Sequence, residues 1–331
     1  MTQTVHGNEK LEKSTQLEFA NNKLLIDLCG EFDRNLAELE NKFSIQIVRR
    51  GNLLDLIGDK FSAEKVGLVL SALYQRLESG KLVEFSDIDR EIRFVLHGKK
   101  SSTDQMEMFS SAHFEIRTRK KTVEPRTKAQ RDFVQSLTDN ELAFGIGPAG
   151  TGKTYLAVAV GVSKFIAGEV DKIILSRPAV EAGEKLGYLP GDMKDKVDPY
   201  MQPLYDALND FLPAKQLAKL IEEKTIEIAP LAFMRGRTLA HSYIVLDEAQ
   251  NATSMQMKMF LTRLGEGSRM VITGDRSQID LPKGAMSGLL DAESLLSKIS
   301  TIGFNYFTSK DVVRHPLVAT IIEAYESRNT K

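Results

Sequence analysis

The sequence has 331 residues, 42% of them hydrophobic, which is enough chain for two domains that each bury a core. Its 44 basic and 45 acidic side chains leave a net charge of -1, which excludes binding to nucleic acid or membranes through bulk charge, so any such contact must be a local patch. The single cysteine, Cys29, excludes a disulfide framework and a cysteine metal site, and the lack of a signal-peptide pattern or a bilayer-spanning apolar run indicates a cytoplasmic protein with no membrane contact.

Composition divides the chain into two domains and a linker. Residues 98–126 are first polar and turn-rich and then short, basic and extended, as expected of a linker. We therefore expect a small N-terminal domain over residues 1–97 and a larger domain over residues 127–331. The basic side chains from Arg117 to Lys128 could contact phosphates or could simply be solvated.

The N-terminal domain is predicted to be a small α+β unit of order β-α-α-β-β-α. Periodicity gives its strands and helices, in chain order, as residues 17–20, 21–28, 35–43, 44–50, 53–59 and 62–77. This order resembles a KH nucleic-acid-binding domain, whose first two helices are joined by a G-x-x-G loop that clamps nucleotides. Here that loop reads Gly30-Glu31-Phe32-Asp33, so the second glycine is missing and the loop is acidic. Nucleic-acid binding and a plain packing or assembly role both stay open for this domain.

A phosphate-binding loop opens the larger domain. The apolar segment 142–146 is followed by G-P-A-G-T-G-K-T, and then by the helical pattern of residues 155–167. The glycines let successive backbone N–H groups face phosphates at a helix N-terminus, while Lys153 neutralises the β- and γ-phosphates and the hydroxyl of Thr154 holds Mg²⁺. The predicted nucleotide-binding residues are Gly147, Pro148, Ala149, Gly150, Thr151, Gly152, Lys153 and Thr154.

Two acids follow a later apolar strand, over residues 242–246. Buried strand residues that lead straight into Asp247 and Glu248 are costly unless a cation is nearby. We therefore expect Asp247 to hold Mg²⁺ and Glu248 to activate the attacking water.

Another strand, over residues 269–274, ends in a G-D-x-x-Q pattern. Its Gln278 can reach the γ-phosphate or the lytic water. Further strands are predicted at residues 172–177, 225–230 and 303–308, with helical or irregular connections between them. The fold class is therefore α/β, with a parallel sheet.

These segments resemble two known groups of proteins. GPAGTGKT, DEAQ and GDRSQ resemble the Walker A, Walker B and G-D-x-x-Q motifs of superfamily 1 helicases. Longer strings, among them SRPAVEAGEKLGYLPGD, FMRGRTL and DVVRHPLVATIIEAYE, resemble the PhoH-like family over about residues 125–326, and the N-terminal region is also similar to that family's. The resemblance implies a cytoplasmic protein with a RecA-like P-loop core that binds ATP and Mg²⁺ and is connected with RNA metabolism.

The comparison with helicases also raises the question of assembly. Those helicases place ATP between two RecA-like lobes and take an arginine from the second lobe, whereas this chain has room for one lobe after residue 127. Either a neighbouring copy completes the site, in a ring or another homo-oligomer, or hydrolysis is slow and the chain works as a switch. Arg314 is our candidate for an arginine that reaches a neighbour's nucleotide; alternatively, it pairs with an acid such as Asp311.

Base and nucleic-acid contacts rest on single residues. Gln130 lies upstream of the phosphate loop, where superfamily 1 helicases place an adenine-reading glutamine, but a solvated helix position explains it nearly as well. Arg177, Arg235 and Arg237 follow predicted strands, on the edge where open α/β sheets bind ligands. We expect these arginines to contact nucleic acid, with a structural role as the alternative.

Three functional classes fit these patterns. The first is an ATPase stimulated by RNA or single-stranded nucleic acid, such as a helicase, and the second is an ATP-gated adaptor that presents RNA to a ribonuclease without unwinding it. The third, a P-loop kinase for a small molecule, is disfavoured because Glu248 and Gln278 favour water as the phosphoryl acceptor. The first two need the same ATP site, so the sequence leaves them both open.

Overall fold

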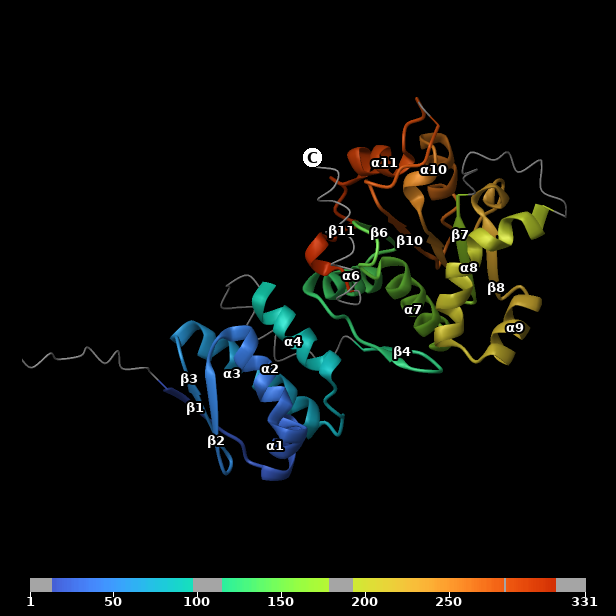
Figure 1. Cartoon of the computed structure of the whole chain (residues 1–331). Coiled ribbons are helices and arrows are strands. Elements are labelled where there is room, and N and C mark those ends of the chain that lie inside the picture. Colours follow the sequence, from blue (N-terminus) through green and yellow to red (C-terminus); the bar gives the residue numbers. More distant parts are fainter. Residues whose placement is uncertain (1–13, 98–114, 179–192, 283, 314–331) are drawn as a thin grey trace, which may run out of the picture. The chain divides into compact units, whose positions relative to one another are not determined.

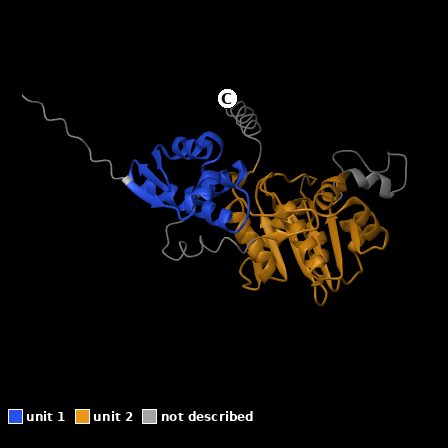
Figure 2. Cartoon of the chain, turned by 90° about the horizontal axis from the view of Figure 1, so that it is seen from below, with its two compact units in different colours: residues 1–112 blue, residues 113–331 orange. Residues whose placement is uncertain are grey.

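The computed structural model describes residues 14–97, 115–178, 193–282 and 284–313, which Figure 1 draws as coloured ribbons. The chain divides into two compact units, residues 1–112 and residues 113–331 (Figure 2). Each unit has its own hydrophobic core and is described by itself. Among the described residues, no helix combines the length and the apolar character that crossing a membrane requires.

The first unit is an antiparallel sheet of order β1-β3-β2 covered by helices. Its described elements are β1 (Ser14–Glu18), α1 (Asn22–Cys29), a 3-10 turn (Glu31–Asp33), α2 (Arg34–Phe43), β2 (Gln46–Arg50), β3 (Leu53–Ile57), α3 (Lys60–Glu78) and α4 (Phe85–His97). The order up to α3 is the predicted one, whereas α4 was not predicted. Leu25 and Leu28 of α1 pack with Leu54 and Leu56 of β3 in the buried core. The KH-like character of this unit stays a prediction.

The loop between α1 and α2 has an unusual backbone. Phe32 and Asp33 have φ values of 54° and 56°, in the left-handed region that side chains with a Cβ rarely adopt. The Phe32 side chain is fully exposed, and Asp33 lies 3.8 Å from the guanidinium of Arg49. The loop therefore presents an exposed aromatic ring, followed by an acid where the predicted G-x-x-G pattern would have its second glycine.

The second unit is built on a six-stranded sheet of order β11-β6-β10-β9-β7-β8, in which every neighbouring pair is parallel. Its strands are β6 (Leu142–Ile146), β7 (Lys172–Arg177), β8 (Ile226–Pro230), β9 (Ser242–Leu246), β10 (Arg269–Gly274) and β11 (Ile302–Tyr306). The predicted α/β fold with a parallel sheet is thereby confirmed. Consecutive parallel strands need crossover connections, and helices provide most of them here.

Helices cover both faces of this sheet (Figure 1). They are α6 (Lys128–Asp139), α7 (Lys153–Ile166), α8 (Met193–Phe211), α9 (Ala214–Glu222), α10 (Ser254–Leu261) and α11 (Gly288–Leu296). Strand residues alternate between the two faces: Tyr243 and Val245 belong to one apolar core, and Ile244 and Leu246 to the other. Burial on both faces explains why the strands read as continuous apolar runs.

Helix α7 lies unusually close to β9. A Cβ atom added to Gly161 of α7 would lie 2.5 Å from Cδ1 of Tyr243, whose ring is fully buried. A side chain at this position would therefore collide with the ring. The missing side chain lets the helix that follows the phosphate loop pack directly on the strand that carries Asp247.

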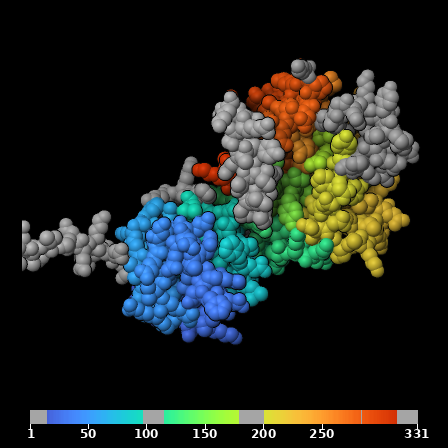
Figure 3. All heavy atoms as spheres, in the orientation of Figure 1, coloured from blue at the N-terminus to red at the C-terminus, as the bar shows by residue number. Residues whose placement is uncertain are grey.

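The basic segment expected as a linker forms a short hairpin over β4 (Ile116–Arg117) and β5 (Thr122–Val123). In the space-filling view of Figure 3 the hairpin borders the helical region of α8 and α9. Lys120 donates its backbone N–H to the carbonyl of Phe211 and its Nζ to that of Asn209, at 3.1 and 2.6 Å, and Lys121 pairs with Asp210 at 2.7 Å. These lysines therefore bind the end of α8.

Candidate nucleotide-binding site

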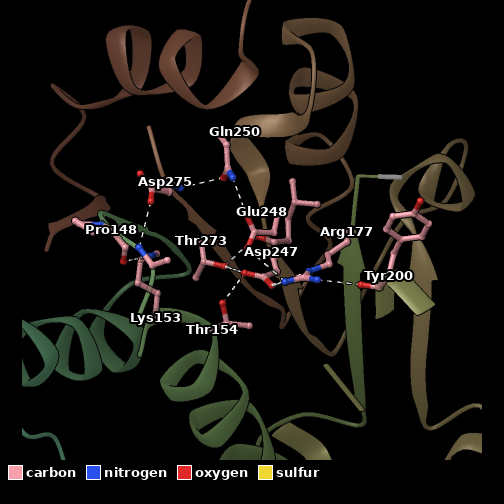
Figure 4. Close-up of polar contacts among 12 residues, drawn as sticks. Pro148, Lys153, Thr154, Arg177, Tyr200, Asp247, Glu248, Gln250, Thr273 and Asp275 are labelled. Carbon is pink, nitrogen blue, oxygen red and sulfur yellow. Dashed lines mark hydrogen bonds and ion pairs between the residues drawn. The ribbon is translucent and has the colours of Figure 1, made fainter. Parts of the chain in front are cut away.

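Three neighbouring strands end at the candidate site, which Figure 4 shows in close-up. The phosphate loop follows β6, the two acids follow β9, and β10 lies between these strands and ends at Gly274. Because the strands are parallel, their carboxyl ends meet at one edge of the sheet, where open α/β folds bind their ligands. Strand order therefore brings together groups that are far apart in the sequence.

The phosphate loop bends back into the start of α7. Gly152, the residue before the helix, has a φ of 81°, which glycine adopts without steric cost. At the start of the loop, the N–H of Gly147 donates to the carbonyl of Gly274 at 3.0 Å, which ties the loop to β10. The loop thus presents backbone N–H groups at a helix N-terminus, where an anion is favoured.

Lys153, the first residue of α7, is buried beneath the loop. Its Nζ donates to the carbonyl oxygens of Gly147 and Pro148, at 2.6 and 2.8 Å. Burial lowers the pKa of Lys153, and the nearby carboxylates of Asp275, Asp247 and Glu248 oppose that shift. Phosphate oxygens would offer this ammonium group charged acceptors in place of neutral carbonyls.

The next residue, Thr154, contacts the first of the two acids. Its Oγ1 donates to Oδ1 of Asp247 at 2.5 Å, and Thr273 of β10 donates to the same oxygen at 2.7 Å. A hydroxyl and a carboxylate are the oxygen ligands that Mg²⁺ takes, with water and nucleotide phosphates completing its shell. Thr154 and Asp247 therefore fit a Mg²⁺ ion that arrives with a nucleotide.

Glu248 follows in a left-handed backbone conformation, with φ 52° and ψ 37°. For a residue with a Cβ this conformation is uncommon, and such residues cluster at functional sites. The turn leaves the side chain of Glu248 about two-fifths exposed, at 41%, whereas that of Asp247 is 3% exposed. An acid that is partly open to solvent can meet a water molecule, as a general base must.

Arg177, the last residue of β7, binds both acids. Its Nε and Nη2 lie 2.9 and 2.8 Å from Oδ2 of Asp247, and Nη2 lies 3.4 Å from Oε1 of Glu248. Its remaining nitrogen, Nη1, donates to the backbone carbonyl of Tyr200 in α8 at 2.9 Å. The guanidinium is thus held on three sides.

Gln250 and Asp275 link the acids to the phosphate loop. The fully buried amide of Gln250 donates to Oε2 of Glu248 at 2.6 Å and accepts the N–H of Asp275 at 2.9 Å. The carboxylate of Asp275 in turn accepts the N–H of Ala149, in the loop, at 3.2 Å. A continuous chain of hydrogen bonds therefore joins Glu248 to the phosphate loop.

The family model and a curated relative point to the same family. A family model described as PhoH-like protein matches residues 122–326. The chain is also 49% identical over 307 residues to a PhoH-like protein of Bacillus subtilis (strain 168), a match that covers 92% of this chain and 94% of that protein. This chain belongs to the PhoH-like family.

Two solved structures that are similar to this PhoH-like chain are only distantly so. The Sulfolobus solfataricus SWI2/SNF2 ATPase core in complex with dsDNA is 18% identical, with a TM-score of 0.29, over 44% of this chain and only 30% of that one. The UvsW helicase from bacteriophage T4 is 13% identical, with a TM-score of 0.36, over 73% of this chain and 78% of that one. We draw no argument about activity from such distant matches.

The two glutamines predicted as site residues differ in burial, since one is buried and the other is exposed. Gln130 in α6 is buried: its amide donates to the carbonyl of Thr151 in the phosphate loop at 2.9 Å and accepts the N–H of Arg126 at 2.6 Å. Gln278 lies in the turn after β10 with its side chain exposed, and its N–H donates to the carbonyl of Asp275. Adenine contact by Gln130 and γ-phosphate contact by Gln278 stay predictions.

The other predicted arginines also differ from one another. Arg237 makes a bidentate ion pair with Glu227 of β8, at 2.7 Å for both bonds, and this pairing raises the pKa of the arginine. Arg235 follows the short 3-10 turn after β8 (Leu231–Met234) and is exposed. Arg314 lies outside the described residues. Nucleic-acid contact by Arg177, Arg235 and Arg237 stays a prediction.

Sequence reasoning missed Gln250, Thr273 and Asp275 as site residues. A signal for each was present. Thr273 is a polar residue near the end of the apolar β10 run, Gln250 completes the DEAQ string, and Asp275 belongs to the G-D-x-x-Q pattern. What the sequence lacked was the strand order that places β10 between the loop and the acids.

A pocket of about 400 Å³ opens beside Thr154 and Asp247. It is lined by Thr154, Tyr155, Arg177, Pro203, Asp206, Ala207, Asp210 and Asp247. The lining contains three carboxylates and one guanidinium; Arg177 pairs with Asp247, and Lys121 pairs with Asp210. The pocket therefore suits water and uncharged or cationic groups better than it suits a second phosphorylated molecule.

Proposed function

We propose that this PhoH-like chain is an ATPase that requires Mg²⁺ and couples ATP hydrolysis to the binding or remodelling of RNA or another single-stranded nucleic acid. The observation that carries the proposal is the contact between Thr154 and Asp247, with Glu248 directly beside it. It joins the phosphate loop to the acid pair. P-loop hydrolases need both of these parts in one place.

Each residue has a defined task in this reaction. The loop N–H groups and Lys153 hold the β- and γ-phosphates, while Thr154 and Asp247 would hold Mg²⁺, which would supply positive charge to the phosphate oxygens. The oxygen of a water molecule attacks the γ-phosphorus, and Glu248 accepts a proton from that water. The bond from that phosphorus to the β-γ bridging oxygen breaks, which releases ADP and inorganic phosphate.

Support for a nucleic-acid partner is local. Arg235 lies exposed beyond the carboxyl end of β8, on the same edge of the sheet as the ATP site. An arginine there can contact a phosphate backbone without competing for the nucleotide.

The decisive experiment measures ATP turnover with and without Mg²⁺, single-stranded RNA and single-stranded DNA, and measures duplex unwinding in the same samples. We expect turnover to require Mg²⁺ and to rise with nucleic acid. Stimulation without unwinding would favour the adaptor, which presents RNA to a ribonuclease. Absence of turnover under every condition would contradict the ATPase.

Two lysine variants locate the reaction. Lys153→Ala removes the buried ammonium of the loop, and we expect it to abolish ATP binding or turnover. Lys219→Ala removes a lysine of α9 whose side chain is 72% exposed, and it should leave turnover unchanged. Full activity of Lys153→Ala would exclude the phosphate loop as the reaction site.

We further propose that a second copy of the chain completes the site, in a ring or another homo-oligomer. Beyond Lys153, the transition state of phosphoryl transfer is commonly stabilised by a further arginine. Arg177 is already bound to two carboxylates, so it is poorly placed to be the arginine that stabilises the transition state. A neighbour's Arg314 remains the candidate from the sequence.

A further inference from the structure

The carboxylate of Glu248 is held from two sides by groups that do not belong to the phosphate loop. Arg177 contacts one of its oxygens at 3.4 Å, and Gln250 contacts the other at 2.6 Å (Figure 4). We propose that Arg177 and Gln250 are positioning residues that set the direction of the Glu248 and Asp247 carboxylates for ATP hydrolysis. This inference rests on the proposed function, and we call the two residues the carboxylate clamp.

The Arg177 half of the clamp fixes Asp247 first. Two guanidinium nitrogens bind Oδ2 of Asp247, which leaves Oδ1 turned to Thr154 and Thr273. Groups that hold the second oxygen of a ligating carboxylate set its orientation toward the metal. Arg177 therefore directs Oδ1 to the position where Thr154 would meet Mg²⁺.

A lysine could not replace Arg177. The guanidinium reaches Asp247, Glu248 and the carbonyl of Tyr200 at once because its nitrogens point in three fixed directions. A lysine keeps the positive charge but offers one flexible ammonium group. Arg177→Lys therefore tests geometry while the charge at the site is preserved.

The Gln250 half of the clamp ties Glu248 to the neighbouring strand. Its side chain is fully buried and is used at both ends, with the amide nitrogen on Glu248 and the amide oxygen on the N–H of Asp275. Ser287 also donates to its backbone carbonyl at 2.8 Å, which fixes the main chain of this residue. Such a side chain has no freedom to follow Glu248 if that carboxylate turns away.

The backbone of Glu248 makes this support necessary. A left-handed residue persists only where its surroundings determine the conformation. The clamp meets that requirement, because each carboxylate oxygen has its own partner and each partner is anchored elsewhere. Without the clamp, the carboxylate could rotate away from the attacking water.

The substitution Gln250→Glu separates the two bonds of Gln250. It retains an oxygen that can accept the N–H of Asp275, but it removes the donor to Glu248 and places a second carboxylate beside it. We expect the ATP turnover number to fall by about 10- to 100-fold, with the affinity for ATP within about threefold of wild type. Gln256→Glu makes the same change at an N-terminal position of α10, outside the clamp, and should leave turnover unchanged.

For Arg177→Lys we expect a similar fall in turnover measured without nucleic acid. We also expect the Mg²⁺ concentration that half-saturates binding of a fluorescent, non-hydrolysable ATP analogue to rise by about 10-fold or more, because Oδ1 of Asp247 is no longer directed. The matched control is Arg269→Lys. Arg269 donates to the carbonyls of Thr138 and Asn140 at the opposite end of the sheet, so both measurements should be unchanged.

A double-variant cycle shows whether Gln250 acts through Glu248. In a Glu248→Gln background, adding Gln250→Glu should lower the residual turnover by less than about twofold, since the group it positions is already gone. If the turnover losses of the two single variants instead multiply in the double variant, Gln250 has a general structural role and the proposal for Gln250 is overturned.

Failure of the clamp differs from failure of the proposed function. If wild type hydrolyses ATP and Arg177→Lys matches it in basal turnover and in Mg²⁺ requirement, then Arg177 is not a positioning residue. A loss confined to nucleic-acid affinity would assign it to nucleic acid instead. If wild type does not hydrolyse ATP, the proposed function fails, and the Mg²⁺ titration still decides whether Arg177 orients Asp247.

Discussion

The contact between Gly161 and Tyr243 gives a prediction whose size follows from the structure. In Gly161→Ala, the new Cβ would lie 2.5 and 2.8 Å from two ring carbons of Tyr243. Alanine gains about 1 kcal/mol of helix propensity over glycine, but overpacking a core costs about 1–3 kcal/mol. The ring is fully buried and cannot swing into solvent, so we expect the upper part of that range and a net loss of about 1–2 kcal/mol.

Thermal unfolding followed by circular dichroism measures this loss. For a domain of about 200 residues, 1 kcal/mol corresponds to about 2–4 °C in Tm. Turnover should fall as well, because a wider gap between α7 and β9 draws Thr154 away from Asp247. Gly67→Ala in α3 is the control: its Cβ would meet only Leu17, at 3.8 Å, so stability should hold or rise.

A variant of Tyr243 tests whether the loss in Gly161→Ala comes from contact with the tyrosine ring. Tyr243→Leu removes the ring that the new methyl group strikes, so its combination with Gly161→Ala should cost less than the sum of the two single changes. If Gly161→Ala unfolds at the wild-type temperature and hydrolyses ATP at the wild-type rate, the close packing of α7 on β9 is wrong.

Three further predictions concern the acids, the cysteine and assembly. Glu248→Gln should still bind Mg-ATP but lose hydrolysis by roughly 100-fold or more, and loss of binding instead would exchange its role with that of Asp247. Burial raises the pKa of Cys29 to about 11, above its unfolded value, so at pH 8 an aromatic disulfide reagent should modify it only as the N-terminal unit unfolds; rapid labelling of the native protein would contradict that burial. Arg314→Ala should cut turnover by roughly 1000-fold or more with ATP affinity nearly intact, and mixing it with Glu248→Gln should restore some activity; no recovery in mixtures shown to exchange subunits would argue against a shared site.

Local patterns predicted the segments that form most of the candidate site. The phosphate loop and the pair Asp247-Glu248 are contiguous strings next to apolar runs, and the six strands of the second unit were all predicted from such runs. Hydrophobic burial on both faces of the sheet produces those runs, which is why they could be read without a structure.

Contacts between distant segments could not be predicted in the same way. Arg177 meets Asp247, 70 residues later, because β7 pairs with β9, and nothing in either segment specifies that pairing. Arg237 was nominated for nucleic acid, whereas Glu227 engages its guanidinium across a turn whose geometry the sequence does not define. The strands of the β4–β5 hairpin are too short to show periodicity.

That hairpin has a practical consequence for anyone who isolates the second unit. The family match begins at residue 122, the first residue of β5, so a fragment cut at that boundary would lose β4 with the lysines that bind α8. Ile116 would be lost from the hydrophobic core. Lys121, whose Nζ lies over the rings of Phe211 and Tyr155, would be lost as well, and Tyr155 is the neighbour of Thr154. A fragment that begins at residue 115 keeps all of these contacts, and its turnover can be compared with that of the intact chain on equal terms.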